Sequence, residues 1–375
     1  MIFQSEASWI NELRSRFDVI VIGAGPSGAS AACSLAQRGF DTLLIEKKTL
    51  PRKKPCAGML PPKIRRAVEI PYRLIQRPID GFRVFASSGV SATIRFPKGS
   101  GFTVERASFD HWMVEKATQE GSKLLQGTDV LRVKETPRGA LVVTPTSRLL
   151  SRYVVAADGV RSEVRRSVGL RAPSRDQLAF AYQIELEHDE KVIDETVGNY
   201  FEAYYDVSIV REGYYWIAPH RNRFFIGFGT PLGGILAPPR RIIAEFLKLK
   251  RLKPLIRDAR IVGEESHLIP YSGPYEVLGT LRTLFVGDAG GFVHPFTGEG
   301  IYYAIVSGRA AAEAISTHRS GDELARLYKE SAERRGLLKL KTYIEMVNKK
   351  DYFLRISNVI NQYVSLFENV SKDLP

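Results

Sequence analysis

The sequence predicts an α/β protein in which a doubly wound sheet is joined to a smaller α+β part. An apolar, β-branched run at 17–22 leads directly into a cluster of glycines and a helix of small residues. Two more apolar runs, at 153–156 and 283–286, each lead into an Asp and a Gly. Residues 180–228 hold 12 of the chain's 38 aromatic residues. Because aromatic residues are enriched in strands, this region predicts a second sheet.

The segment after the first run has the pattern of a dinucleotide-binding loop. The six residues GAGPSG (23–28) follow the strand, and a helix and a second strand lead on to Glu46. In this pattern Gly23 permits a tight turn, Gly25 lets the backbone approach a pyrophosphate, and Gly28 lets the helix pack on the strand. The helix N-terminus attracts phosphate, and Glu46 can accept hydrogen bonds from a ribose diol. An acid there disfavours the 2′-phosphate of NADP and leaves FAD and NAD open.

The other two apolar runs favour FAD. Asp158-Gly159 and Gly287-Asp288 each follow a buried strand, and ligands bind at the carboxyl ends of parallel strands. Asp288 can hydrogen-bond a hydroxyl chain such as the ribitol of FAD, which NAD lacks. For either Asp-Gly pair alone, a simple turn is the alternative.

These segments resemble the flavoprotein monooxygenase superfamily typified by para-hydroxybenzoate hydroxylase. The matches are GAGPSG (23–28), ADGVRS (157–162), GDAGGFVHPFTGEGI (287–301) and ERASFDHWM (105–113). The resemblance implies a doubly wound, Rossmann-type FAD-binding domain with an inserted, mainly antiparallel substrate sheet and C-terminal helices. The expected domains are 17–72, 105–175 and 276–320 for FAD, 73–104 and 176–275 for the substrate, and 321–375 for the C-terminal helices.

The resemblance also implies which residues contact FAD. Arg106 matches an arginine that opens a helix and contacts FAD, and Val130 matches a backbone contact on the adenine side. A helix expected from Gly298 to Thr317 would point its N-terminus at the flavin pyrimidine end, with a helix that binds no ligand as the alternative. The expected set is Gly23, Gly25, Pro26, Ser27, Gly28, Glu46, Lys47, Ala57, Arg106, Val130, Asp158, Gly159, Gly287, Asp288, Gly298, Gly300 and Ile301.

Three segments resemble the geranylgeranyl reductases within this superfamily. KPCAGM (54–59) is similar to that family's Lys-Pro-Cys-Gly-Gly segment, GYYWIAP (213–219) to its Tyr-x-Trp-x-Phe-Pro signature, and PFTGEGI (295–301) to its helix start. The sequence departs from the family where Ala57 and Met59 replace glycines and where Ala218 replaces a phenylalanine. The resemblance implies an FAD-dependent oxidoreductase that reduces carbon–carbon double bonds of a geranylgeranyl-type chain by hydride transfer from reduced flavin.

Cys56, Tyr214 and Trp216 are the catalytic candidates. A thiol beside the flavin can orient the alkene or donate the proton that completes its reduction, and a small buried hydrophobic residue is the alternative. A tyrosine and water are the other proton donors to consider. Tyr214 and Trp216 share one strand face by alternation and can line a pocket above the flavin, whereas a sheet core is the alternative.

The electron donor and the exact chemistry stay open at this point. The sequence has no second dinucleotide loop, and the resemblance allows NADPH or a low-potential carrier as the donor. A flavin-dependent aromatic monooxygenase or halogenase is the alternative enzyme, although GYYWIAP falls short of the Trp-x-Trp-x-Ile-Pro halogenase signature. The six histidines show no metal-ligand spacing, so we expect no metal.

The formal net charge of +13 comes from two segments of the 375 residues. Residues 47–77 carry ten bases and one acid, and residues 132–175 carry ten bases and three acids. We expect a basic face suited to a diphosphate headgroup, NADPH phosphates or an anionic bilayer, and no nucleic-acid partner. Solvated surface around the FAD domain is the alternative.

The remaining expectations concern the setting of the protein. Two cysteines and no convincing targeting or membrane-spanning segment predict a cytoplasmic monomer, with peripheral contact to the inner membrane face left open. The last helix is expected to carry an apolar stripe that packs on the body or faces a membrane. Its members are Phe353, Ile356, Ile360, Tyr363, Val364 and Phe367.

Overall fold

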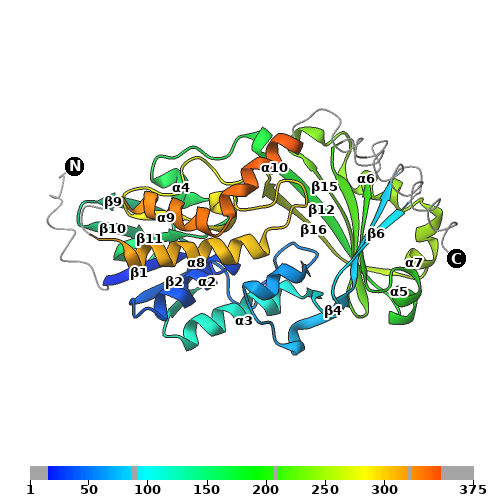
Figure 1. The fold of residues 1–375 in the computed structure, drawn as a ribbon, viewed down its shortest axis with the longest axis horizontal. Coiled ribbons are helices and arrows are strands. Elements are labelled where there is room, and N and C mark those ends of the chain that lie inside the picture. The colour runs from blue at the N-terminus through cyan, green and yellow to red at the C-terminus, as the bar shows by residue number, and fades with distance from the viewer. Residues whose placement is uncertain (1–15, 87–90, 206–209, 211, 320–322, 348–375) are drawn as a thin grey trace, which may run out of the picture. The chain divides into compact units, whose positions relative to one another are not determined.

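The computed structural model describes residues 16–86, 91–205, 210, 212–319 and 323–347 (Figure 1). The stripe expected between Phe353 and Phe367 lies outside the described residues. Two compact units divide the chain, and each contains a seven-stranded sheet. Unit 1 comprises described residues within 1–52, 107–173 and 270–343, and unit 2 those within 53–106, 174–269 and 344–375.

The sheet of unit 1 contains five parallel strands in the order β8, β2, β1, β11 and β17, as the apolar runs predict. β10 pairs antiparallel with the first half of β11, and β9 pairs antiparallel with β10. Residues 19–21 are completely buried, because the centre of a parallel sheet is covered on both faces. The strands are β1 (Arg16–Ile22), β2 (Thr42–Glu46), β8 (Lys123–Gln126), β9 (Arg132–Thr136), β10 (Gly139–Val143), β11 (Arg148–Ala156) and β17 (Thr283–Phe285).

Helices α2 and α8 of unit 1 pack closely against each other (Figure 1). The Ser30 hydroxyl donates to the carbonyl oxygen of Ile305 at 3.0 Å, and a Cβ on Gly308 would lie 2.3 Å from the carbonyl oxygen of Ser27. Glycine at this position therefore lets the two helix backbones approach. The α-helices of unit 1 and its boundaries are α2 (Pro26–Ala36), α3 (Arg106–Gln119), α4 (Glu163–Ser167), α8 (Ile301–Thr317), α9 (Leu324–Arg334) and α10 (Leu340–Val347), the last of which extends into unit 2.

Unit 2 is built on the strand order β16-β12-β15-β14-β13-β5-β6, in which β13 and β5 are parallel. The pairs from β12 to β13 and the pair β5–β6 are antiparallel. A second, antiparallel sheet has the order β3-β7-β4. The strands are β3 (Met59–Leu60), β4 (Ile75–Ile79), β5 (Gly81–Ala86), β6 (Ser91–Arg95), β7 (Gly101–Val104), β12 (Leu178–Glu187), β13 (Tyr200–Tyr205), β14 (Tyr214–Pro219), β15 (Arg223–Pro231) and β16 (Arg260–Pro270).

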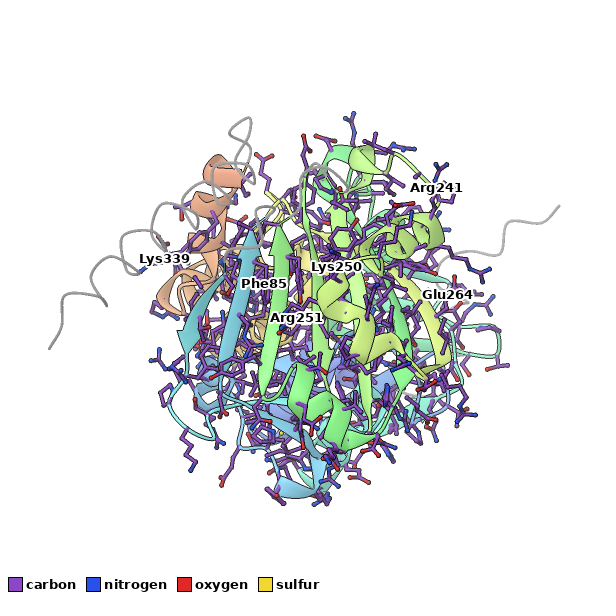
Figure 2. All side chains as sticks on the ribbon, turned by 90° about the vertical axis from the view of Figure 1, so that its right-hand side faces the viewer. Phe85, Arg241, Lys250, Arg251, Glu264 and Lys339 are labelled. Carbon is purple, nitrogen blue, oxygen red and sulfur yellow. The ribbon has the colours of Figure 1, made fainter. Side chains whose placement is uncertain are left out.

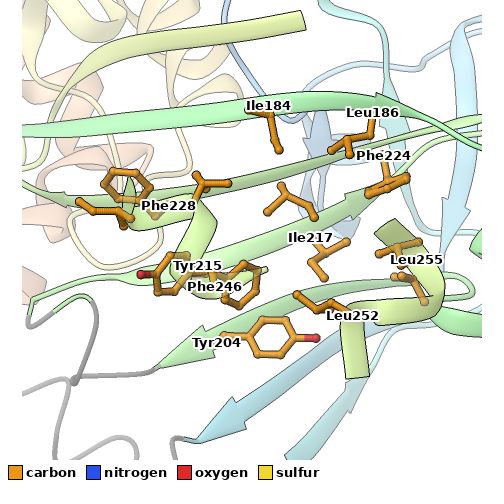
Figure 3. Packing of buried hydrophobic residues seen from close by; sticks show 14 of the residues in the cluster. Ile184, Leu186, Tyr204, Tyr215, Ile217, Phe224, Phe228, Phe246, Leu252 and Leu255 are labelled. Carbon is orange, nitrogen blue, oxygen red and sulfur yellow. The ribbon is translucent and has the colours of Figure 1, made fainter. Parts of the chain in front are cut away.

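One face of the large sheet in unit 2 forms the core with helices α5 (Glu190–Thr196), α6 (Pro239–Phe246) and α7 (Lys253–Ile256). The rings of Tyr215 and Phe246 stack there with their centroids 4.4 Å apart (Figure 3). The aromatic residues of 180–228 are therefore divided between two faces, because neighbouring side chains of a strand point in opposite directions.

The core of unit 2 also encloses an ion-pair network around Glu202, whose side chain is completely buried. Arg83 Nη1 lies 2.7 Å from Glu202 Oε1, and Arg251 Nη1 lies 2.9 Å from Glu202 Oε2. The Arg251 guanidinium stands 4.5 Å from the centre of the Phe85 ring (Figure 2). Burial raises the pKa of Glu202, while the two arginines favour the charged form.

The compact units divide the chain differently from the expected domains. Residues 53–72 were expected with the FAD domain, but they fall in unit 2 because their backbone pairs with β7 of that unit. Residues 323–343 group with unit 1, where the fully buried Tyr328 of α9 donates to the carbonyl oxygen of Phe285 at 3.0 Å. None of the helices in the described ranges has both the length and the apolar composition of a membrane span.

Candidate functional site

The glycine loop of unit 1 joins β1 to α2 through two close backbone contacts. Gly23 has a φ of +101°, and a Cβ there would lie 2.3 Å from the carbonyl oxygen of Ala157. A Cβ on Gly28 would lie 1.8 Å from the carbonyl oxygen of Gly23. Gly23 is therefore required for packing against the residue after β11, and Gly28 for packing within the loop.

Gly25 differs from these two glycines because the space beside it is open. The nearest atom to an added Cβ is Arg52 Nη2, 3.9 Å away. Gly25 is also the N-cap of α2, and no side chain in the described residues caps this helix. The first N–H groups of an uncapped helix need partners and attract phosphate. The loop therefore fits the pyrophosphate of a dinucleotide.

Glu46 is fixed beside this loop at the end of β2. Its Oε2 accepts a hydrogen bond from the Ala24 N–H at 2.9 Å, and its Oε1 accepts one from the Lys48 N–H at 3.1 Å. Arg52 Nε lies 3.3 Å from Glu46 Oε2, while Arg52 Nη1 donates to Oδ2 of the buried Asp110 at 3.0 Å. Sequence reasoning missed Arg52, which it counted only among the bases of 47–77. Its position between two carboxylates and the loop is a tertiary feature.

Asp158 follows β11 with its two oxygens in different situations. Oδ2 accepts from the Val164 N–H at 3.0 Å, which helps to start α4. Oδ1 is buried, and no described residue supplies it with a hydrogen-bond donor. Burial raises the pKa of this carboxyl. Because an unpaired buried acceptor is costly, Oδ1 fits a donor from a bound cofactor.

The third strand end brings Asp288 close to the start of α8. The Gly287 N–H donates to the Ser307 hydroxyl at 2.9 Å, and a Cβ on Gly300 would lie 3.8 Å from Asp288 Oδ1. Gly300 is the N-cap of α8, which no described side chain caps. The helix begins at Ile301, later than the expected Gly298, because Gly298 has a φ of +67° and cannot continue a right-handed helix.

The other residues expected to contact FAD lie in varied settings. Pro26 and Ser27 form the buried first turn of α2, and Lys47 is exposed directly after β2. The Val130 side chain packs in the core of the unit 1 sheet, so only its backbone can reach a ligand. Arg106 is the first residue of α3 and is buried.

Cys56 lies in a segment of unit 2 that is anchored on two sides. The Val104 N–H donates to the Gly58 carbonyl at 2.9 Å, and the Gly58 N–H lies 3.4 Å from Cys56 Sγ. Gly58 has a φ of +70°, and a Cβ there would lie 2.0 Å from the carbonyl oxygen of Val104. On the other side, His220 Nε2 lies 3.0 Å from the carbonyl oxygen of Ala57. Since a carbonyl only accepts, Nε2 carries the proton.

His220 is the second residue that sequence reasoning missed. It is buried with 4% of its surface exposed, and this burial lowers its pKa to about 4. The imidazole is therefore neutral near pH 7 and acts as a hydrogen-bond donor. Its position directly after the GYYWIAP segment was the available signal.

Tyr214 and Trp216 lie on the same face of β14, as alternation predicts, with ring centroids 5.9 Å apart. Trp216 forms a buried cluster with Ala218, against which Ala57 and Tyr214 pack. Trp216 Nε1 is buried, and the described residues offer it no hydrogen-bond acceptor. The residue that follows Cys56 thus contacts the same cluster as Trp216.

Two glycines of β15 make room for the Trp216 indole. Gly227 pairs with Trp216 across the strands, and a Cβ there would lie 2.3 Å from the indole ring. A Cβ on Gly229 would lie at an ordinary 3.5 Å from it. Sequence reasoning missed both glycines, although two glycines on one face of a strand are a recognisable sign of close packing.

The structure groups the candidate residues in two sets. Gly23, Gly25, Glu46, Asp158 and Asp288 belong to unit 1. The catalytic candidates Cys56, Tyr214 and Trp216 belong to unit 2, together with Ala57 and His220. Within the described ranges, no three His, Cys, Asp or Glu side chains are arranged to hold a metal ion.

Known proteins resemble this chain over most of its length. A family profile described as "FAD binding domain" matches residues 16–223. A geranylgeranyl diphosphate reductase of Rhodobacter capsulatus is 32% identical over 80% of this chain and 75% of its own length. A digeranylgeranylglycerophospholipid reductase of Methanocaldococcus jannaschii is 29% identical over 85% of this chain and 83% of its own.

Solved structures share the fold. A geranylgeranyl bacteriochlorophyll reductase-like protein from Thermoplasma acidophilum matches with a TM-score of 0.81 and 22% identity, over 92% of this chain and 91% of that one. The halogenase PltM matches with a TM-score of 0.70 and 17% identity, over 88% of this chain and 75% of that one. At such identities the likeness concerns the fold alone.

Proposed function

This chain belongs to the geranylgeranyl reductase family of FAD-dependent oxidoreductases, and we propose on that premise that it reduces carbon–carbon double bonds of an isoprenoid chain. The names of the two relatives specify a geranylgeranyl diphosphate and a digeranylgeranylglycerophospholipid as their substrates. The observation that carries the proposal is the packing of Ala57, next to Cys56, against the Trp216 cluster.

The residues of unit 1 would hold FAD at the ends of three strands. The N-terminus of α2 and the open Gly25 would bind the pyrophosphate, and Glu46 would accept from the ribose. Asp288 would accept from the ribitol hydroxyls, and the first turn of α8 would bind the pyrimidine end. When bound and reduced, FAD supplies the hydride for the double bond.

The Trp216 face would bind the apolar chain. Tyr214 and Trp216 present adjoining rings, and a short, buried Ala218 stands where the family signature has a phenylalanine. Burial of an apolar chain against such rings excludes water and contributes about 25 cal/mol for each Å² removed from water. The departure at Ala218 therefore favours a wider pocket than the signature residue would give.

Cys56 would supply the proton. One alkene carbon would receive the hydride, and the other would receive the proton of the Cys56 thiol. Water would then return a proton to the thiolate. The hydrogen bond from His220 to Ala57 would hold this segment so that the thiol keeps its place. A tyrosine or water remains the alternative donor if the thiol proves dispensable.

The wider setting is part of the same proposal. NADPH or a low-potential electron carrier would reduce the FAD. The protein would act as a monomer at the cytoplasmic side, and the basic segment 47–77 would meet an anionic bilayer from which lipid is drawn.

The second candidate is a flavin-dependent halogenase or aromatic monooxygenase, because the halogenase PltM shows that this fold also serves such chemistry. Oxygen separates the two. The reductase should saturate a prenyl alkene under strict anaerobiosis when dithionite supplies electrons. A product that carries oxygen or halogen, and that forms only in air, would replace the reductase by this second candidate.

A further inference from the structure

Unit 2 contains a cavity of about 670 Å³. Neither Cys56 nor Trp216 lines it. Residues of β4, β7 and α5 line it together with the turn that joins β14 to β15. Small-molecule sites have volumes of about 300–1,000 Å³, so this cavity has the size of a ligand site. The side chains that determine its chemistry are Arg65, Tyr72, Arg77, Phe102, Asp194 and Arg221.

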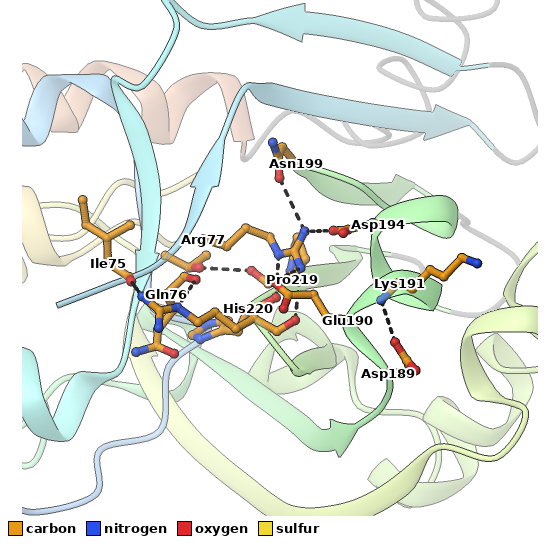
Figure 4. Close-up of polar contacts among 12 residues, drawn as sticks. Ile75, Gln76, Arg77, Asp189, Glu190, Lys191, Asp194, Asn199, Pro219 and His220 are labelled. Atoms are coloured by element: carbon orange, nitrogen blue, oxygen red, sulfur yellow. Dashed lines mark hydrogen bonds and ion pairs between the residues drawn. The ribbon is translucent and has the colours of Figure 1, made fainter. Parts of the chain in front are cut away.

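Arg77 is a fixed part of the wall, and its charge is already compensated (Figure 4). The buried guanidinium pairs with Asp194 and lies 3.5 Å from Glu190. It also donates to the carbonyl oxygens of His220 at 2.5 Å and Arg221 at 3.0 Å. Asp194 and Glu190 both face this one guanidinium, so the three groups together carry one net negative charge.

Arg65 and Arg221 are held differently, by backbone carbonyls. Arg65 Nη2 donates to the Gly99 oxygen at 2.5 Å, and the guanidinium stands 5.3 Å from the Phe102 ring centre. Arg221 donates from Nε to the Gln76 oxygen and from Nη2 to the Ile75 oxygen, both at 3.2 Å. Within the described chain, neither arginine has a carboxylate partner. Both side chains are exposed, and backbone oxygens orient them.

These anchors leave most of the donors available. A guanidinium has five N–H groups, of which Arg65 uses one and Arg221 uses two in the contacts above. Arginine binds phosphate oxygens with charge-assisted, often paired hydrogen bonds, so two arginines that line one cavity suit a phosphorylated ligand. The exposed Tyr72 ring adds an apolar surface for the organic part of a ligand.

We propose that this cavity binds the phosphate groups of a phosphorylated small molecule, with Arg65 and Arg221 as the phosphate ligands. The source of the phosphate is either a prenyl diphosphate or the phosphates of a nicotinamide dinucleotide. Arg77 joins the cavity to the Cys56 segment, because it donates to His220, whose ring donates to Ala57. Binding can be measured without turnover, so its failure would leave the reductase proposal unaffected.

Calorimetric titration of the full-length, FAD-loaded protein with inorganic pyrophosphate tests this site. R65Q and R221Q should each weaken pyrophosphate binding about tenfold, since a hydrogen bond to a charged group contributes about 1.5–3 kcal/mol. R66Q is the matched control, because Arg66 is as exposed as Arg65 and Arg221 but does not line the cavity. Equal losses in R65Q and R66Q, or the absence of saturable binding to the wild type, would overturn the proposal.

Competition then identifies the source. Displacement of pyrophosphate by geranyl diphosphate supports a prenyl diphosphate ligand, and displacement by adenosine 2′,5′-bisphosphate supports a nicotinamide dinucleotide. If neither compound displaces pyrophosphate, the cavity is not a site for either source and the proposal fails. The far-ultraviolet circular dichroism and FAD content of each variant show that the fold is retained.

Discussion

The imidazole Nε2 of His220 lies 3.0 Å from the carbonyl oxygen of Ala57, the residue that follows Cys56. His220 is buried, and its backbone carbonyl oxygen accepts a hydrogen bond from Arg77 Nε. His220 therefore acts as a positioning residue for the Cys56 segment, and several expectations depend on this contact.

Removal of the His220 donor should loosen the Cys56 segment. In His220→Phe the Ala57 oxygen loses this donor, which should cost about 1–3 kcal/mol of the free energy of unfolding. His220→Gln can still donate and should recover part of that loss. The rate at which a thiol reagent labels Cys56, measured in a Cys33→Ala background, should rise in His220→Phe. Wild-type stability and labelling rate in His220→Phe would exclude the positioning role.

The stability of the protein should fall as the medium becomes acidic. The pKa of His220 is about 4 in the folded state and 6.5 when the group is free, so the unfolded state binds the proton first. This group should therefore remove about 2 kcal/mol of the free energy of unfolding between pH 7 and pH 5. Urea unfolding at both pH values checks this, and His220→Gln should lose that part of the difference. An equal pH dependence in both proteins would contradict the assignment.

The size of residue 227 should control the position of the Trp216 indole. A Cβ on Gly227 would lie 2.3 Å from the ring, so Gly227→Ala must displace the indole. Such overpacking costs about 1–3 kcal/mol and should raise the Michaelis constant for an isoprenoid substrate. Gly229→Ala is the control, because its Cβ would lie 3.5 Å from the ring. If both variants behave alike, the indole does not form the binding face.

The Arg52 side chain should matter more for FAD binding than the exposed Lys47 side chain. Arg52 bridges Glu46 and Asp110 beside the open Gly25, whereas Lys47 is exposed. Arg52→Gln should lower the affinity of the apoprotein for FAD at least tenfold, as loss of a charge-assisted contact costs about 1.5–3 kcal/mol. Titration of apoprotein with FAD, followed by flavin fluorescence, measures this. Comparable losses in Lys47→Gln would instead support the role that the sequence assigns to Lys47.

The sequence predicted the fold class and the elements of the cofactor unit because their signals are local. A β-branched run, a glycine loop and an Asp-Gly pair are each recognisable within a few consecutive residues. The alternation that places Tyr214 and Trp216 on one face is equally local.

The features that sequence reasoning missed depend on contacts between distant segments. His220 meets Ala57 across 163 positions, and Arg52 meets Asp110 across 58. The charge excess of 47–77 gave no means to separate Arg65, which lines a cavity, from Arg66, which does not. That distinction requires Arg65 to meet the distant Gly99 and Phe102 in the folded chain.

Anaerobic reoxidation of the reduced holoenzyme tests the central claim most directly. Protein with photoreduced FAD is mixed with a geranylgeranyl substrate in the absence of oxygen. The flavin absorbance is followed over time, and the mass of the product is measured by mass spectrometry. The account predicts that the flavin reoxidises and that the product gains two hydrogen atoms for each FAD oxidised, more slowly in Cys56→Ala. A flavin that stays reduced until oxygen is admitted would contradict it.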